Sequence, residues 1–165
     1  MVILLMGVSG VGKTTVGKLL ASELGWDFVD GDDCHPAANV EKMRSGIPLT
    51  DADRAPWLET LRALITSWIA ARKNVVLACS ALKRTYRQSL CVASEVQVIY
   101  LRGTLQLLRQ RLRARGGHFM TEPMLDSQLA ALEEPDQAVT VDVNPSPKEI
   151  VAEIRARLAP SKNPR

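Results

Sequence analysis

Residues 7–14 of the chain read Gly7-Val8-Ser9-Gly10-Val11-Gly12-Lys13-Thr14, which matches the pattern G-x-x-x-x-G-K-[ST]. In this pattern the glycines let the backbone turn tightly, so that its N–H groups converge on an anion. The lysine reaches the outer phosphates of a nucleotide, and the hydroxyl that follows it binds Mg²⁺. The segment therefore predicts a phosphate-binding loop, with Lys13 in the chemistry and Thr14 at the metal.

The flanks of this loop supply the strand and the helix that it requires. Val2–Met6 is a short apolar run, typical of a strand buried on both faces of a parallel sheet. Beyond the loop, Val16, Leu19, Leu20 and Leu24 share one helical face, and the positive end of that helix points at the loop. This context favours nucleotide binding over an ordinary glycine-rich turn. The residues expected at the nucleotide are Gly7, Val8, Ser9, Gly10, Val11, Gly12, Lys13, Thr14 and Thr15.

Composition predicts one globular domain over residues 1–165. The chain has 165 residues, 46% of them hydrophobic and 24% charged, and a formal charge of +3, which is too small to indicate nucleic-acid binding. Cys34, Cys79 and Cys91 are odd in number and lack C-x-x-C spacing, which favours a reducing compartment. The first apolar run has no basic leader, and no stretch is long enough to cross a membrane. We therefore expect a cytoplasmic protein.

Apolar runs typical of strands recur along the chain, with helical patterns between them. These runs are Val2–Met6, Phe28–Val29, Val75–Ala78, Val96–Leu101 and Val139–Val143. The alternation predicts an α/β domain with a mostly parallel sheet. A long helix is expected after Thr50, because Thr50 is a good N-cap and Asp53 stands three residues later, close to a capping box.

An acidic cluster follows the second expected strand, where the sequence reads Asp30-Gly31-Asp32-Asp33-Cys34-His35-Pro36. Ligands of parallel α/β sheets bind at the carboxyl ends of strands, so we expect this cluster to face the loop. We expect one carboxylate to cap a helix that starts near Pro36, Asp30 to turn towards the metal, and Asp32 to act as the base. The residues alone leave open which of Asp30 and Asp32 is the base, and whether His35 is structural or functional.

Basic residues follow the third expected strand. At its end, where many phosphate-loop proteins carry an acidic metal ligand, the sequence has Cys79-Ser80, so metal binding is assigned to Thr14 with Asp30 or Asp32. Lys83, Arg84 and Arg87 come next and are expected to hold an anionic substrate. The alternative is an exposed basic helix start.

A later stretch is rich in arginine and contains no acidic residue. Its arginines are Arg102, Arg109, Arg111, Arg113 and Arg115. Gly116-Gly117 is a natural hinge within it, so we expect a lid around residues 112–125 that closes over phosphates. A solvated helix face is the alternative. Together, the loop, the acidic cluster, the basic residues and the lid predict phosphoryl transfer from ATP to a small hydroxylated anion.

Eight segments share a more specific pattern. They are Met6-Gly7-Val8-Ser9-Gly10, Asp30-Gly31-Asp32-Asp33-Cys34-His35-Pro36, Lys42-Met43, Gly46-Ile47-Pro48-Leu49-Thr50-Asp51-Ala52-Asp53-Arg54, Pro56-Trp57-Leu58, Cys79-Ser80-Ala81-Leu82-Lys83, Tyr86-Arg87 and Gly117-His118-Phe119. Through them the chain resembles the small gluconate kinases over nearly its whole length.

The resemblance implies ATP-dependent phosphorylation of D-gluconate at its 6-hydroxyl, giving 6-phospho-D-gluconate for the pentose phosphate route. It implies a five-stranded parallel sheet of order 2-3-1-4-5 with helices on both faces, a helical lid, and commonly a homodimer. By the same resemblance, one group of residues faces the sugar acid: Asp32, His35, Arg54, Lys83 and Arg87. Arg111 and Arg115 face the nucleotide.

Two alternatives remain at this point. One is a kinase of another small hydroxy acid such as shikimate, against which the segments Cys79–Lys83 and Lys42–Arg54 favour gluconate. The other is a non-catalytic nucleotide-binding module. A guanine-binding Asn-Lys-x-Asp segment would support a module of that kind, and the sequence contains none.

Overall fold

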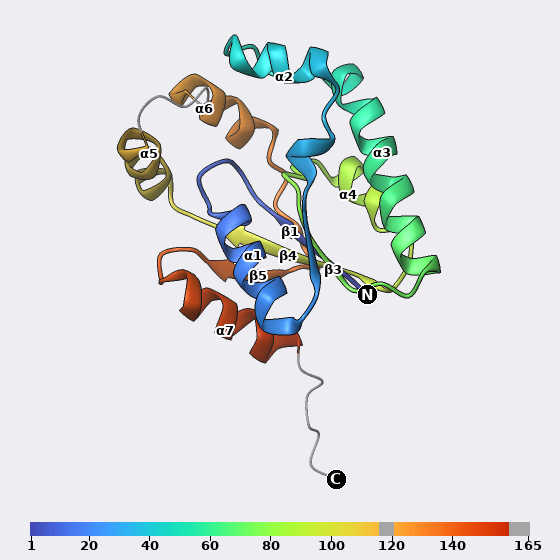
Figure 1. The fold of residues 1–165 in the computed structure, drawn as a ribbon. Helices are drawn as coiled ribbons and strands as arrows, with labels where there is room; N and C mark the ends of the chain where they lie inside the picture. Colours follow the sequence, from blue (N-terminus) through green and yellow to red (C-terminus); the bar gives the residue numbers. More distant parts are fainter. Residues whose placement is uncertain (116–120, 159–165) are drawn as a thin grey trace.

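Five parallel strands form a single sheet in a computed structural model that describes residues 1–115 and 121–158 (Figure 1). The strands are β1 (Val2–Met6), β2 (Asp27–Asp30), β3 (Val75–Ala78), β4 (Val96–Arg102) and β5 (Val139–Asp142). The helices are α1 (Lys13–Leu24), the 3₁₀ helix η1 (Gly31–Cys34), α2 (Ala37–Arg44), α3 (Asp51–Ala70), α4 (Arg84–Leu90), α5 (Leu105–Ala114), α6 (Glu122–Ala131) and α7 (Pro147–Leu158).

The strand order is β2-β3-β1-β4-β5, which confirms the predicted order and the parallel pairing. β1 lies at the centre, where Val2 pairs with Val75 of β3 on one side and with Val96 of β4 on the other. All five side chains of β1 are fully buried. A strand that is covered on both faces needs the continuous apolar run that the sequence shows.

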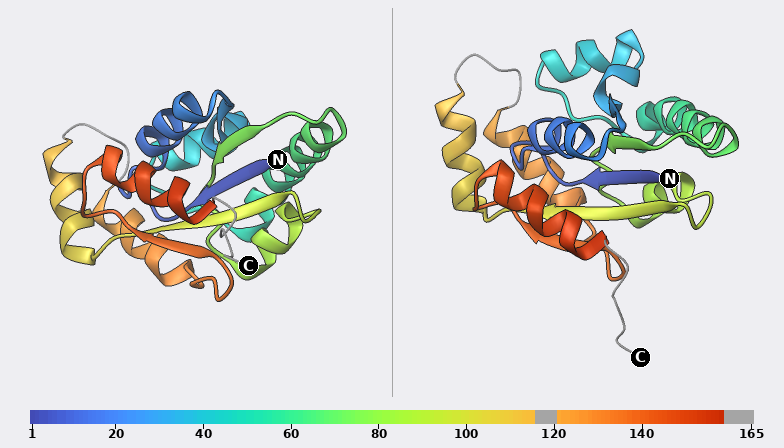
Figure 2. Two further views of the ribbon diagram at one scale, coloured as in Figure 1. Left: turned by 90° about the horizontal axis from the view of Figure 1, so that it is seen from below. Right: turned by 60° about the horizontal axis from the view of Figure 1, so that its bottom comes forward.

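Alternation along β1 divides the core into two layers. Ile3 and Leu5 pack with residues of α1 and α7, whereas Leu4 packs on the opposite face with Leu61 of α3 and Leu90 of α4. Figure 2 shows the same arrangement from two further sides, with helices on both faces of the sheet. The sheet is thus a rigid central layer whose carboxyl end carries the functional loops.

The ends of several strands differ from the apolar runs. β2 begins at Asp27 and ends at Asp30, one residue beyond the predicted run at each end, while β4 extends to Arg102 and β5 ends at Asp142. These polar residues join the ladder through the backbone, as Asp30 pairs with Ala78 and Arg102 with Asp142. Apolar periodicity does not detect them because ladder pairing needs only main-chain groups.

The start of α3 follows the prediction. The Thr50 hydroxyl accepts a hydrogen bond from the Asp53 N–H, and the Asp53 carboxylate accepts one from the Thr50 N–H, which completes the capping box. Asp53 also pairs with Lys42 of α2, both carboxylate oxygens lying 2.9 Å from Nζ. The hydrogen bonds from Thr50 and Lys42 lower the pKa of Asp53 to about 2. This carboxylate therefore ties α2 to the start of α3.

Helices α2, α5 and α6 lie beyond the carboxyl end of the sheet (Figure 1). The predicted lid of residues 112–125 includes the end of α5 and the start of α6. Its Gly116-Gly117 hinge, and His118 and Phe119, lie outside the described residues. No helix in the described part of the chain is long and apolar enough to cross a membrane.

Candidate active site

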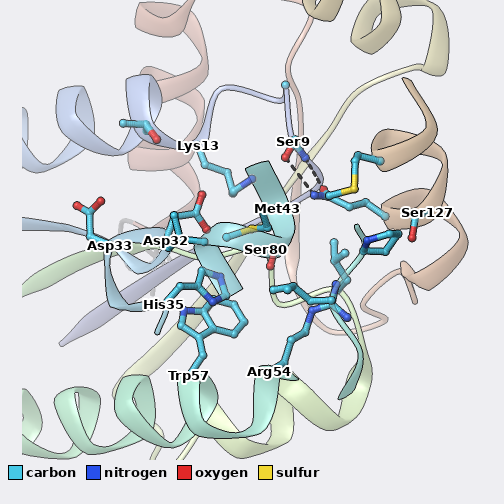
Figure 3. Close-up of a pocket in the computed structure, with 18 of the residues that line it drawn as sticks. Ser9, Lys13, Asp32, Asp33, His35, Met43, Arg54, Trp57, Ser80 and Ser127 are labelled. Atoms are coloured by element: carbon cyan, nitrogen blue, oxygen red, sulfur yellow. Dashed lines mark hydrogen bonds between the residues drawn. The ribbon is translucent and has the colours of Figure 1, made fainter. Parts of the chain in front are cut away.

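A cavity of about 560 Å³ lies at the carboxyl ends of the strands, between the loop that follows β1 and helices η1, α2, α3 and α6 (Figure 3). It brings together residues that are far apart in the sequence. The predicted site residues that line it are Ser9, Gly10, Gly12, Lys13, Thr14, Thr15, Asp32, His35, Arg54 and Arg115. Those that do not are Gly7, Val8, Val11, Asp30, Lys83, Arg87 and Arg111.

The loop of residues 7–12 has the shape of an anion cradle. A Cβ atom at Gly7 would lie 2.7 Å from the carbonyl oxygen of Leu101, so only glycine fits there. Gly12 has a φ of 92° and caps α1, whose first residue is Lys13. The N-terminal end of α1 therefore points into the cavity, where its partial positive charge favours an anion.

Lys13 lies over this loop. Its Nζ donates to the carbonyl oxygens of Gly7 at 2.9 Å and Val8 at 3.1 Å. Removal from solvent lowers the pKa of Lys13, while the carboxylates of Asp32 and Asp30 act in the opposite direction. Lys13 is thus held beside the loop by backbone carbonyls, within the electrostatic reach of two carboxylates.

The carboxylates of Asp30 and Asp32 have different environments. Asp30 accepts hydrogen bonds from the Thr14 hydroxyl at 2.8 Å and from the Asp32 N–H at 3.0 Å, and so caps η1. The predicted capping role thus falls to Asp30, at η1 instead of α2. The Asp32 carboxylate has no hydrogen-bond partner among the described residues and faces the cavity (Figure 3). Removal from solvent raises its pKa, although Lys13 opposes the shift.

His35 forms part of the opposite wall. Its ring stacks on Trp57 with the ring centroids 4.3 Å apart and the planes at 14°. The Trp57 Nε1–H donates to the carbonyl oxygen of Gly31 at 2.7 Å, which fixes the indole. Removal from solvent, together with the positive charge of Arg54, lowers the pKa of His35 to about 4. The imidazole is therefore neutral at physiological pH.

Of the two cations Arg54 and Lys83, which are expected on the substrate side, one lines the cavity and the other pairs with a carboxylate. Arg54 lines the cavity, and its Nη1 lies 3.4 Å from the Tyr86 hydroxyl. Lys83 pairs with Asp51 at 2.9 Å, and the Tyr86 hydroxyl donates to the same carboxylate. Arg54 is therefore the side chain of this group that is placed to meet an anionic ligand.

Arg87 departs from its expected place. It is 8% exposed, and its Nη1 donates to the carbonyl oxygens of Ala81 at 2.9 Å and Leu82 at 3.0 Å. It lines a separate cavity of about 630 Å³. Arg84 also points elsewhere and pairs with Asp136 at 3.1 Å. The helical turn of α4 directs both side chains away from the candidate active site.

The two arginines expected at the nucleotide also differ in whether they line the cavity. Arg115 lines the cavity. Arg111 instead approaches the loop from its carbonyl side, donating to Gly10 at 3.1 Å, to Val11 at 3.3 Å and to Val143 at 2.7 Å. Arg111 therefore supports the loop without lining the cavity.

Several residues of the site were not predicted from the sequence, and three of them make specific contacts. Gln128 of α6 binds Ser9, Asn39 of α2 binds His35, and Trp57, which the helical pattern assigns to the core, also lines the cavity. Gln128 lies 119 residues from Ser9 in the sequence, so no local pattern identifies it. Asn39 lies only four residues after His35, but His35 is in extended backbone before α2, so helical spacing does not identify the contact either.

Comparison with known proteins decides the family. Residues 2–135 match a family model described as an AAA domain. A probable gluconokinase of Xenopus tropicalis is 43% identical over 96% of this chain and 93% of its own length. The chain belongs to the gluconokinase family. This confirms the resemblance that the eight sequence segments indicated.

Two further gluconokinases support the assignment. That of Gluconobacter oxydans is 49% identical over 81% of this chain and 75% of its own length. The crystal structure of a gluconokinase from Sinorhizobium meliloti superposes with a TM-score of 0.84 at 44% identity, covering 95% of this chain and 90% of that one. The agreement therefore extends over nearly all of both chains.

The donor atoms near the loop suit a magnesium ion in such a kinase. Among residues 1–115 and 121–158, no three histidine, cysteine, aspartate or glutamate side chains group as a metal site. The hydroxyl of Thr14 and the carboxylate of Asp30, which share a hydrogen bond of 2.8 Å, are hard oxygen donors of the kind that Mg²⁺ prefers. A kinase commonly completes the coordination of Mg²⁺ with substrate phosphates and water.

Proposed function

We propose that the protein is a gluconokinase that transfers the γ-phosphate of ATP to the 6-hydroxyl of D-gluconate, giving 6-phospho-D-gluconate and ADP. One observation supports this above all. A single cavity joins the loop lysine Lys13, the carboxylate of Asp32, which has no hydrogen-bond partner in the described part of the chain, and the guanidinium of Arg54. A hydroxylated acid with its carboxylate at Arg54 can present a hydroxyl to Asp32 beside the phosphate loop.

On the nucleotide side, the N–H groups of the loop, the N-terminal end of α1 and Lys13 hold the phosphates. Thr14 and Asp30 would hold Mg²⁺, which supplies neutralisation of the charge on the transferred phosphate. Arg115 lines the same cavity and adds a positive charge at its α5 side. These groups position the phosphates and neutralise their negative charge, and these two effects are most of what phosphoryl transfer requires.

On the sugar-acid side, Asp32 accepts the proton of the attacking hydroxyl. Its raised pKa makes it a stronger base than an ordinary aspartate. Asp30 is the weaker candidate for this role because its two oxygens already bind Thr14 and the backbone of Asp32. Arg54 binds the carboxylate, whereas Lys83 and Arg87 are bound to other protein groups.

The proposal extends to the setting of the enzyme. We place it in the cytoplasm, where ATP is available, and its three free cysteines agree with a reducing compartment. We also propose a homodimer, as the family resemblance implies. Light scattering on the purified protein measures this directly, and a monomer at micromolar concentration contradicts it.

The function is tested by measuring ADP release from Mg·ATP with gluconate, shikimate, glucose or no acceptor. Strong stimulation by gluconate alone is expected, and it should be lost in Lys13→Ala and on chelation of Mg²⁺. Stimulation by shikimate instead keeps the kinase mechanism and replaces the substrate. ATP binding without stimulation by any acceptor contradicts the enzyme assignment.

A further inference from the structure

We propose that Asn39 is a positioning residue that fixes His35 as the tautomer with its proton on Nε2, so that His35 donates a hydrogen bond to an oxygen of the sugar acid. The identification of the ligand as a sugar acid rests on the proposed function. The tautomer rests on three contacts around Asn39 and His35, which are independent of any ligand.

Asn39 is one of two buried polar or charged residues in the described part of the chain. It lies in α2 and is 3% exposed. Its Nδ2 donates to the carbonyl oxygen of Asp53 at 2.9 Å and lies 3.2 Å from Nδ1 of His35. The two hydrogens of one amide nitrogen are thus directed at two partners, one in α3 and one after η1.

The Asp53 carbonyl determines which way the amide of Asn39 points. A carbonyl oxygen only accepts hydrogen bonds, so the atom of Asn39 that faces it at 2.9 Å must be the nitrogen. A reversed amide would place two acceptor oxygens against each other in a buried site, which is unfavourable. The nitrogen is therefore also the atom that faces His35.

It follows that Nδ1 of His35 is an acceptor. An imidazole nitrogen that accepts a hydrogen bond carries no proton, so in the neutral ring the proton sits on Nε2. The stack on Trp57 fixes the plane of the ring, and the bond from Trp57 to Gly31 fixes the indole. With Nδ1 bound to α2, Nε2 is the ring nitrogen left for the cavity that His35 lines.

The charged surroundings keep the ring in this neutral form. Burial of the ring lowers its pKa, and the positive charge of Arg54 in α3 acts in the same direction, giving a pKa of about 4. Asp32 and Asp33 line the same cavity from η1. In Figure 3 the ring of His35 lies between Asp32 and Arg54. A neutral N–H at this place suits a hydroxyl along the chain of the sugar acid, leaving the carboxylate to Arg54.

Nitrogen NMR on histidine-labelled, ligand-free protein tests the tautomer. The chain has two histidines, so the signal that is missing from His35→Gln belongs to His35. At pH 6 to 8 we expect Nε2 to carry the proton and Nδ1 to lack one. A proton on Nδ1, or a mixture of tautomers, overturns the proposal. This result does not depend on whether gluconate is the substrate, so it is separate from failure of the proposed function.

Steady-state kinetics test the consequence for the substrate. Asn39→Ala frees the tautomer and is expected to raise KM for gluconate by up to about tenfold, the value of one hydrogen bond, with KM for ATP within about twofold. In the His35→Gln background, the glutamine amide can donate a hydrogen bond without Asn39. There, Asn39→Ala is expected to raise KM for gluconate little further. An equal rise of KM in both backgrounds contradicts a role through His35.

A matched control separates positioning from simple support of α2. Lys42→Met removes the ion pair between the same two helices and leaves Asn39 in place. KM for gluconate is expected to stay within about twofold in this variant. A rise as large as that of Asn39→Ala would show that loosening α2 is sufficient, and would overturn the proposal. If Asn39→Ala does not fold, the NMR measurement on the wild-type protein still tests which tautomer His35 adopts.

Discussion

The side-chain amide of Gln128 holds Ser9 by two hydrogen bonds: Oε1 accepts from the Ser9 N–H at 2.8 Å, and Nε2 donates to the Ser9 hydroxyl at 3.2 Å. Ser9 lies in the middle of the phosphate-binding loop, whereas Gln128 belongs to α6, which lines the other side of the cavity. The pair is therefore a direct link between α6 and the loop. We expect this link to keep the loop ordered in the absence of a bound phosphate.

Gln128→Met is expected to loosen the loop, because methionine keeps the length of the side chain and removes both hydrogen bonds. Hydrogen exchange of the Ser9 amide should accelerate, and the Kd for ATP should rise about two- to tenfold. Gln110→Met, at an exposed position of α5, is the matched control and should change neither quantity. Unchanged Ser9 exchange in Gln128→Met would exclude the link as a source of order.

Asp32→Asn removes the proposed base and is expected to lower kcat by about 10²–10⁴ with little loss of stability. Lys13→Ala should have a comparable effect through the transferred phosphate. Asp33→Asn changes the neighbouring carboxylate and should reduce kcat much less. Near-normal turnover in Asp32→Asn would instead indicate Asp30 as the base. An Asp30 variant should then be compared with a Thr14 variant, because the two side chains share a hydrogen bond.

Arg111→Met is expected to affect the loop although Arg111 does not line the cavity. The guanidinium donates to Gly10, Val11 and Val143, and charged hydrogen bonds of this kind contribute about 1.5–3 kcal/mol each when buried. Because the site is only partly buried, a loss of about 1–3 kcal/mol in total is expected from urea unfolding. A variant as stable as the wild type would show that these contacts are replaced by water.

Acid should destabilise the protein partly through His35. Its pKa is about 4 in the folded state against 6.5 ordinarily, so the unfolded chain binds the proton first as the pH falls. The stability from the neutral ring is present above pH 6.5 and is lost as the pH approaches 4. Urea midpoints at pH 7 and pH 5 should differ more in the wild type than in His35→Gln. Equal differences in the two proteins would show that the proton uptake linked to unfolding occurs at groups other than His35.

The fold was largely predictable from the sequence because its signals are local. A continuous apolar run, a glycine-rich turn and a cap at Thr50 each require only neighbouring residues, and β1, β3 and the start of α3 have the predicted bounds. η1 was not predicted, since a single 3₁₀ turn has no periodicity to detect.

The candidate site was predictable only where one segment supplies it. Lys13, Thr14 and Asp32 follow directly from strand ends, and the structure places them together. The orientations of Lys83, Arg87 and Arg111 depend on Asp51, on the carbonyls of the turn before α4, and on the far side of the loop. Such partners are determined by how distant segments pack together, and a sequence pattern carries no information about that packing.

The two halves of the cavity rest on strands of very different protection. The phosphate loop leaves β1, which has a partner on each side. In contrast, η1 with Asp32 leaves β2, which lies at the end of the strand order and, among the described residues, pairs with β3 alone. Terminal strands and the segments attached to them open at lower free energy than a central strand. On gentle warming, sugar-acid binding should therefore fail before nucleotide binding, and the protein should pass through a state that still retains ATP after it has stopped working as a kinase.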